Sequence, residues 1–294
     1  MKNILSLSFL LFFSAMTVLG QVKLEYKLEK DDVFTIKQEA KQIITQKLDG
    51  AEHELTNEID GVLEFRVLGE EDNNYEIALT FKDLNLKMIS SIQGELMNVA
   101  AKEIVEGDVQ SNVFNSLLEH PIQMTLSRNG HILKVKGGDS LVAKMAQASG
   151  LEDEFSLNMM KKSLEKEFGS EALSSSYEQM TYLYPQQQVK PGDTWENEYS
   201  GKLSTKNTWT LETIKDTSAE IMGKAEVTMD ITEAATTMNL TGTQDTHITT
   251  DLTSGFIKTM KVEGKSQGTG TMAQLGDQKI PTTIKSTITY ERIN

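Results

Sequence analysis

The chain has 294 residues, 24% of them charged, with a formal net charge of −14 and no cysteine. So negative a surface repels phosphate backbones and anionic lipid head groups, which disfavours nucleic-acid binding and charge-driven membrane docking. The missing cysteine excludes disulfides, thiol nucleophiles and the lipid-carrying cysteine of bacterial lipoproteins, so no direct membrane anchor is expected.

Residues 1–20 have the pattern of a secretory signal peptide. Lys2 precedes an apolar run over residues 4–19, which ends in the small residue Gly20. A basic start, an apolar core and a small residue before the cut are typical of such signals. The run is shorter than the ~20 residues that a spanning helix needs. We expect an exported protein, periplasmic or extracellular, whose residues 21–294 form a single α+β domain.

The N-terminal half, residues 21–136, alternates apolar and polar residues with period two, which predicts antiparallel strands near 34–47, 53–68 and 75–91. Alternation is lost over 94–119, where helical spacing predicts a short helix near 109–118, stopped by Pro121. Asn129-Gly130 then joins strands 122–126 and 132–135. This dipeptide predicts a hairpin turn in which both residues adopt positive φ.

Residues 137–184 are expected to form a helical insert between two strand-rich halves. Asp139 can cap a helix that runs to Gly150. Apolar residues then repeat at three and four residues on either side of Gly169 and Ser170, which indicate one helix end and the next helix cap.

The C-terminal half, residues 185–294, is rich in threonine and alternates almost throughout. A Pro191-Gly192 turn leads Trp195 into the first of about seven expected strands. Residues 264–270 are either a glycine-interrupted strand or a loop. The fold class predicted is α+β: one or more curved antiparallel β-sheets, or a half-open barrel, with amphipathic helices inserted in the middle of the chain.

No motif amounts to a catalytic site. The four histidines His53, His120, His131 and His247 lie far apart, without the three-to-five-residue spacing of metal ligands. No serine sits in a Gly-x-Ser-x-Gly elbow, and Gly268-x-Gly270 lacks the third glycine and the helix of a phosphate-binding loop. Trp195 and Trp209 are expected to anchor neighbouring strands in the core. We predict no enzyme activity, no catalytic residue, no metal and no cofactor.

The many methionines can be interpreted in two ways: they fill an ordinary core, or they line an adaptable apolar cavity. The residues chosen to line such a cavity are Met145, Met160, Leu164, Phe168 and Tyr177.

A resemblance adds to this picture. The run 114–145, with its hairpin at Asn129-Gly130, and the stretch Val189-Lys190-Pro191-Gly192-Asp193-Thr194-Trp195 resemble an uncharacterised family of exported proteins common in Bacteroidota. The resemblance implies export and a shared fold, and brings no known activity. In layout alone, the chain is also similar to the half-open barrels of LolA-type lipoprotein carriers, which hold acyl chains between sheet and helices.

Three functions remain open at this point. The first is an exported cell-envelope protein that binds a hydrophobic small molecule or lipid. The second is a structural or protein-interaction component of the envelope that uses exposed strand edges to pair with another envelope protein. The third is a hydrolase with an unrecognised site.

Overall fold

The computed structural model describes residues 21–48, 50–201, 203–233, 236–273, 276 and 278–294, so the expected signal peptide, residues 1–20, lies outside the described residues. The strands are β1 (Val33–Leu48), β2 (Ala51–Glu71), β3 (Asn74–Ser90), β4 (Gly94–Ala100), β5 (Ile122–Leu126), β6 (Ile132–Lys136), β7 (Thr194–Tyr199), β8 (Leu203–Lys215), β9 (Ser218–Glu233), β10 (Thr236–Asp251), β11 (Ile257–Met272) and β12 (Ile280–Arg292). The helices are α1 (Val109–Asn115), α2 (Gly138–Ala148), α3 (Glu154–Phe168) and α4 (Ser170–Thr181).

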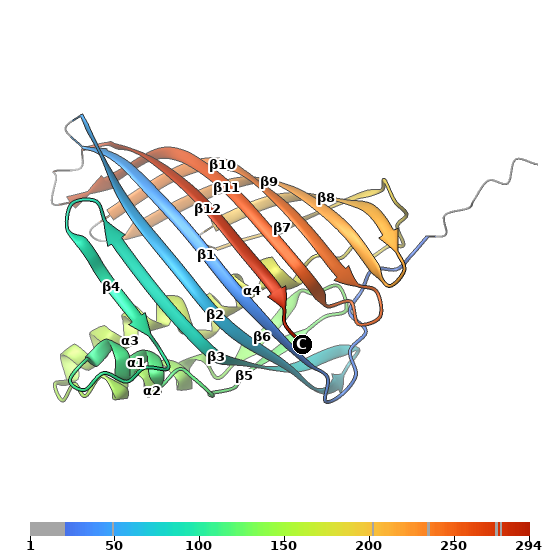
Figure 1. Cartoon of the computed structure of the whole chain (residues 1–294), viewed down its shortest axis with the longest axis horizontal. Coiled ribbons are helices and arrows are strands. Elements are labelled where there is room, and N and C mark those ends of the chain that lie inside the picture. The colour runs from blue at the N-terminus through green and yellow to red at the C-terminus, as the bar shows by residue number, and fades with distance from the viewer. Residues whose placement is uncertain (1–20, 49, 202, 234–235, 274–275, 277) are drawn as a thin grey trace, which may run out of the picture.

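The strands form one large curved antiparallel sheet. Its order is β6-β5-β3-β2-β1-β12-β11-β10-β9-β8-β7, and β4 also pairs with β3. Strand β3 has two partners because β5 pairs with its first residues and β4 with its last. Pairing of β1 with β12 joins the N-terminal and C-terminal strand blocks. The outermost strands β6 and β7 do not pair with each other, so the sheet is a half-open barrel curved over the helices (Figure 1).

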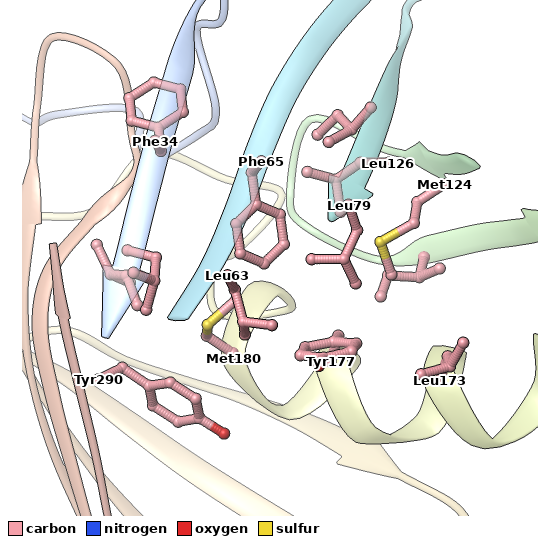
Figure 2. Close-up of a cluster of buried hydrophobic side chains, with 14 of the residues drawn as sticks. Phe34, Leu63, Phe65, Leu79, Met124, Leu126, Leu173, Tyr177, Met180 and Tyr290 are labelled. Atoms are coloured by element: carbon pink, nitrogen blue, oxygen red, sulfur yellow. The ribbon is translucent and has the colours of Figure 1, made fainter. Parts of the chain in front are cut away.

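The sheet has two chemically different faces. Residues opposite each other on neighbouring strands share a face. Phe34 lies opposite Phe65, and Phe65 opposite Leu79, and all three are buried. Figure 2 shows Phe65 and Leu79 directed toward helix α4. We call this face the inner face and the opposite one the outer face.

Glycines on the inner face allow neighbouring strands to approach closely. A Cβ added to Gly242 of β10 would lie 2.1 Å from the carbonyl oxygen of Lys265, and one on Gly268 of β11 would lie 2.2 Å from that of Asn239. At Gly223 the space beside the backbone is filled by the Trp209 ring, 2.4 Å from where a Cβ would stand. Glycine at such positions permits the coiling that a curved sheet needs.

Helices α2, α3 and α4 lie between β6 and β7 in the chain. The Asp153 carboxylate accepts a hydrogen bond from the Ser156 backbone N–H at 2.7 Å, which caps the start of α3. Gly169 ends α3 and is also the residue from which α4 begins. Helix α4 contacts both β6 and β7, so it spans the open side of the sheet.

The core fills the space between the helices and one part of the inner face. The Phe34 ring stacks on that of Phe256 with centroids 4.2 Å apart. The Tyr177 ring of α4 meets the rings of Phe65 and Phe81 edge-on, at 6.3 and 6.4 Å. Figure 2 shows Leu173, Tyr177 and Met180 pointing from α4 toward the sheet. The amphipathic period of the helix therefore supplies one wall of the core.

The predicted fold class is confirmed, with three corrections. Residues 94–100, expected to lack a strand, form β4, a short strand that is exposed along most of its length. The C-terminal half contributes six strands in its described part rather than seven, because residues 264–270 continue β11. Of the Asn129-Gly130 pair, only Gly130 adopts a positive φ, +94°. The prediction left open whether there is one sheet or more, and the β1–β12 pairing joins the two strand-rich halves into one.

Candidate functional site

The five side chains predicted to line a cavity lie on three helices. Met145 is on α2, Met160, Leu164 and Phe168 are on α3, and Tyr177 is on α4. Met145, Leu164 and Tyr177 are buried core members, while Met160 and Phe168 are partly buried against that core. The structure thus brings them together as packing between the helices and the sheet. Their role in holding a ligand stays a prediction.

A second part of the inner face extends beyond the core, toward the β1–β2, β3–β4 and β11–β12 turns. Strand register divides it into rows that run across the sheet. One row, which we call the amide row, contains Gln42, Asn57, Ser286, Gln244, Asn207 and Asn197. The next two rows toward the turns, which we call the apolar rows, include Ile44, Leu55, Ile284, Val227, Leu240 and Met229, together with the polar residues Gln46, His53, Thr205, Ser266 and Thr282. Together these rows form the distal inner face.

The distal inner face combines apolar and uncharged polar side chains, and its apolar residues are separate from the core. Val227, Leu240 and Ile284 are only 5%, 1% and 5% exposed, yet they do not belong to the contiguous core cluster. Ile44 and Leu55 are half-buried and also lie outside it. An apolar surface that the protein's own core does not use is a candidate binding surface.

Among the described residues, acidic residues, lysine and arginine are absent from this surface, and its one histidine is His53. Among the described residues from the row of Ala40 to the row of Gln46, the inner face carries no Asp, Glu, Lys or Arg. The outer face at the same level carries Lys41, Glu58 and Lys285. In a chain that is 24% charged, this separation is strong. The distal inner face therefore suits an uncharged, largely apolar ligand.

The two ends of the amide row differ in how their polar atoms are paired. At the β7–β8 end, the Asn197 side-chain oxygen accepts hydrogen bonds from Trp209 Nε1 at 2.9 Å and Asn207 Nδ2 at 3.0 Å. Asn197 Nδ2 donates to the Tyr182 carbonyl at 2.6 Å, just after α4. At the β1–β2 end, Asn57 Nδ2 donates to Gln42 Oε1 at 3.2 Å, but the buried Asn57 Oδ1 has no partner among the described residues.

Tyrosine hydroxyls do not add charge to the inner face or to the side of α4 packed against it. Burial raises the pKa of Tyr290 to about 12. Burial also raises the pKa of Tyr177 and of Tyr199 far above the usual value of a phenol. Because desolvation penalises the phenolate, these side chains remain neutral at physiological pH.

A hollow of about 810 Å³ is bordered by Asn197, Asn207 and Gln244 of the amide row together with charged residues of the outer face. Two further hollows lie near this surface. One of about 510 Å³ is on the outer face, where Glu39, His247 and Lys261 border it. The other, of about 800 Å³, lies between helices α3 and α4 and the β7–β8 turn. It is bordered by polar residues such as Lys162 and Gln179, and it includes Leu203, which belongs to the apolar rows. The second hollow therefore meets the distal inner face at one corner.

The structure brings together no metal-binding group of three or more His, Asp or Glu within the residues that it describes. His131 contacts the Glu178 carboxylate of α4, and His247 is on the outer face. Trp195 and Trp209 lie opposite each other and are buried, as predicted. In the described ranges, no helix is long and apolar enough to cross a membrane.

The distal inner face was not predicted from the sequence. The signal was present in β1, where Ala40, Gln42 and Ile44 are uncharged while Glu39 and Lys41, on either side of Ala40, are charged. It became a site only once the strand order showed that several strands repeat this pattern on one face.

Comparisons with known proteins give a family and a fold. A model described as "Family of unknown function (DUF6263)" matches residues 72–257. No curated protein matches the sequence. A solved structure titled "Lipid-protein interactions in lipovitellin" is similar over 91% of this chain and 26% of its own, with 13% identity and a TM-score of 0.51. The chain thus spans about a quarter of that protein and shares its fold there. A second alignment, to the structure of DynF from the dynemicin biosynthesis pathway of Micromonospora chersina, includes 92% of this chain and 85% of DynF. It has 5% identity and a TM-score of 0.22.

Proposed function

The chain belongs to DUF6263, a family of unknown function, and since no activity comes with that membership, we propose a function from the sheet itself. The protein is an exported, non-enzymatic binder of a hydrophobic small molecule or lipid, and the distal inner face is its binding surface.

One observation carries this proposal: the uncharged inner face continues past the core. Burial accounts for the missing charge at Val227, Leu240 and Ile284, but Ile44 and Leu55 are only half-buried and lie outside the core, so packing against the helices does not explain why they are apolar. Burying apolar ligand surface against these rows would contribute about 25 cal/mol for each Å² removed from water. A single acyl chain laid along the rows would be held mainly by this effect.

The fold supports the same function. The lipovitellin structure carries lipid–protein interactions in its title, and its similarity to this chain covers 91% of this chain. At 13% identity this likeness concerns the fold alone, so it supports a binding surface of this kind without identifying the ligand.

Adjacent residues of β1 provide a matched test. Ile44 faces inward beside Leu55, and Ile43 faces outward beside Thr56. We expect wild type to bind the fluorescent apolar reporter N-phenyl-1-naphthylamine saturably. Ile44→Glu should lose this binding because it places a carboxylate on the apolar rows, and Ile43→Glu should keep it. Equal binding by both variants, or no binding by wild type, would refute the proposal.

Export is the second element of the proposal, and the apolar run of residues 4–19 after Lys2 supports it. Expression with the complete N-terminus in a bacterial host, followed by fractionation and N-terminal sequencing, tests it. We expect a mature chain that begins at Gln21 outside the cytoplasm. A cytoplasmic chain that retains Met1 would contradict export.

A protein partner is the alternative function, and one feature favours it. Phe155 and Met159 of α3 lie one helical turn apart and are 74% and 54% exposed. Large apolar side chains so placed are typical of contact surfaces. Crosslinking of wild type and a Phe155→Ser/Met159→Ser variant in cells would test this. A neighbour recovered with wild type and lost with the variant is the expected result, and identical crosslinks would count against it.

A further inference from the structure

At the β1–β2 end of the amide row, unlike the β7–β8 end, a buried amide oxygen lacks a hydrogen-bond donor within the described part of the chain, and this difference indicates which ligand the surface binds. Gln42 and Asn57 face each other on β1 and β2, next to the apolar residues Ile44 and Leu55. We propose that this pair selects an acyl chain that carries an uncharged group able both to donate and to accept a hydrogen bond, a hydroxyl or an amide. The inference rests on the proposed function and specifies its ligand class.

The polar atoms of the pair define what is missing. The two side-chain amides share one hydrogen bond, in which Asn57 Nδ2 donates to Gln42 Oε1 at 3.2 Å. Asn57 Oδ1 is buried and has no partner among the described residues. A buried amide oxygen without a partner is costly, so a ligand whose donor reaches it when the half-buried Asn57 side chain turns toward the surface gains affinity. A hydroxyl or an amide fits, whereas a hydrocarbon offers no donor.

The surroundings exclude a charged group at the same place. No Lys or Arg is present on the described inner face from the row of Ala40 to the row of Gln46. A carboxylate or phosphate beside Asn57 would be desolvated without a lysine or arginine to pair with and would meet an amide oxygen rather than a donor; His53, two rows away on β2, is the basic side chain of this face nearest in register. The ligand's polar group is therefore neutral, and its apolar chain lies on the Ile44 and Leu55 side.

Three probes of equal chain length separate these possibilities: 1-decanol, decanoate and decane, each measured by displacement of N-phenyl-1-naphthylamine. For wild type we expect 1-decanol to bind about tenfold more tightly than either decanoate or decane, the size of one hydrogen bond to a buried group. This ranking tests the inference without any substitution, so a variant that fails to fold leaves the test intact.

Substitution then locates the effect. Asn57→Leu removes the unpaired oxygen and should abolish the preference for 1-decanol over decane while decane binding is retained. The control is Glu58→Gln, the next residue, which lies on the outer face and should keep the wild-type ranking. Decanoate binding as tightly as 1-decanol, or an unchanged preference in Asn57→Leu, would overturn the inference while leaving the proposed function standing. Failure of all three probes and of the reporter to bind would refute the proposed function, and the inference with it.

Discussion

Gly130 joins the β5–β6 turn to the end of helix α4, and we expect Gly130→Ala to be strongly destabilising. Gly130 adopts φ +94°, and a Cβ there would lie 1.7 Å from the Thr181 carbonyl oxygen and 2.9 Å from Tyr26 Cε2. The same Thr181 carbonyl accepts a hydrogen bond from Tyr26 Oη at 3.1 Å. An added methyl group would therefore push apart three segments that are distant in sequence.

The expected loss has two parts. Placing a residue with a Cβ in a left-handed conformation costs about 1–2 kcal/mol. Overpacking that displaces backbone costs about 1–3 kcal/mol more, because the clash is with a carbonyl group rather than a flexible side chain. The free energy of unfolding should fall by about 2–5 kcal/mol in total.

Gly94→Ala is the matched control, because Gly94 has φ +78° but nothing within 4 Å of the added Cβ. It should lose only the conformational part. Urea unfolding followed by circular dichroism, with the m-value held comparable, gives both free energies. If the two variants lose the same stability, the contact between the hairpin turn and α4 contributes nothing and the reasoning is wrong.

Three further predictions concern the core and the inner face. Phe34→Ala should lower the free energy of unfolding by about 3–5 kcal/mol, since it removes a buried ring stacked on Phe256 at 4.2 Å; a loss under 1 kcal/mol in urea unfolding would show that the site collapses freely. Gly223→Ala should cost about 1–3 kcal/mol and shift tryptophan emission, because the new methyl group meets the Trp209 ring; an unchanged spectrum would contradict the close packing. Alkaline pH should unfold the protein, because burial raises the pKa of Tyr26, Tyr177, Tyr184, Tyr199 and Tyr290. The unfolded phenols ionise near pH 10 while the folded ones do not, so this stability is complete below pH 10 and is lost as pH rises toward the folded values. Tyr290→Phe should reduce the loss by about 1.4 kcal/mol per pH unit between pH 10 and the folded pKa of about 12, and an identical pH profile would count against it.

Local signals predicted the individual elements well. Period-two alternation is strong where one face is buried and the other carries charge, as around Phe34, Leu63 and Phe65, and these strands were placed within a few residues. It was weak for β4, where Leu96 is exposed and only Val99 is buried, so no alternation stood out. Glycine hid the strand character of residues 264–270, because close approach of neighbouring strands replaces side-chain packing there.

Long-range pairing was beyond local signals. Neither the sequence around Ile36 nor that around Arg292 indicates that the two residues are partners. Without that pairing, the uncharged positions Gln42 and Ile44 cannot be joined to Ser286 and Ile284 into rows. The candidate site therefore emerged from strand order, whereas the helical residues chosen from their methionine content proved to be members of the packed core or to lie against it.

The central seam of the sheet, between β1 and β12, also has a consequence for assembly. Strand β1 leaves the ribosome early and finds one partner in β2, but its other edge stays open until β12 has been made, as the pairing of Ile36 with Arg292 requires. Non-local pairing of this kind slows folding, and an open edge exposes unpaired backbone groups to other chains in the meantime. A chain truncated before residue 280 should therefore leave an unpaired strand edge in the middle of the sheet and aggregate. Only a chain that includes the last strand can close this edge.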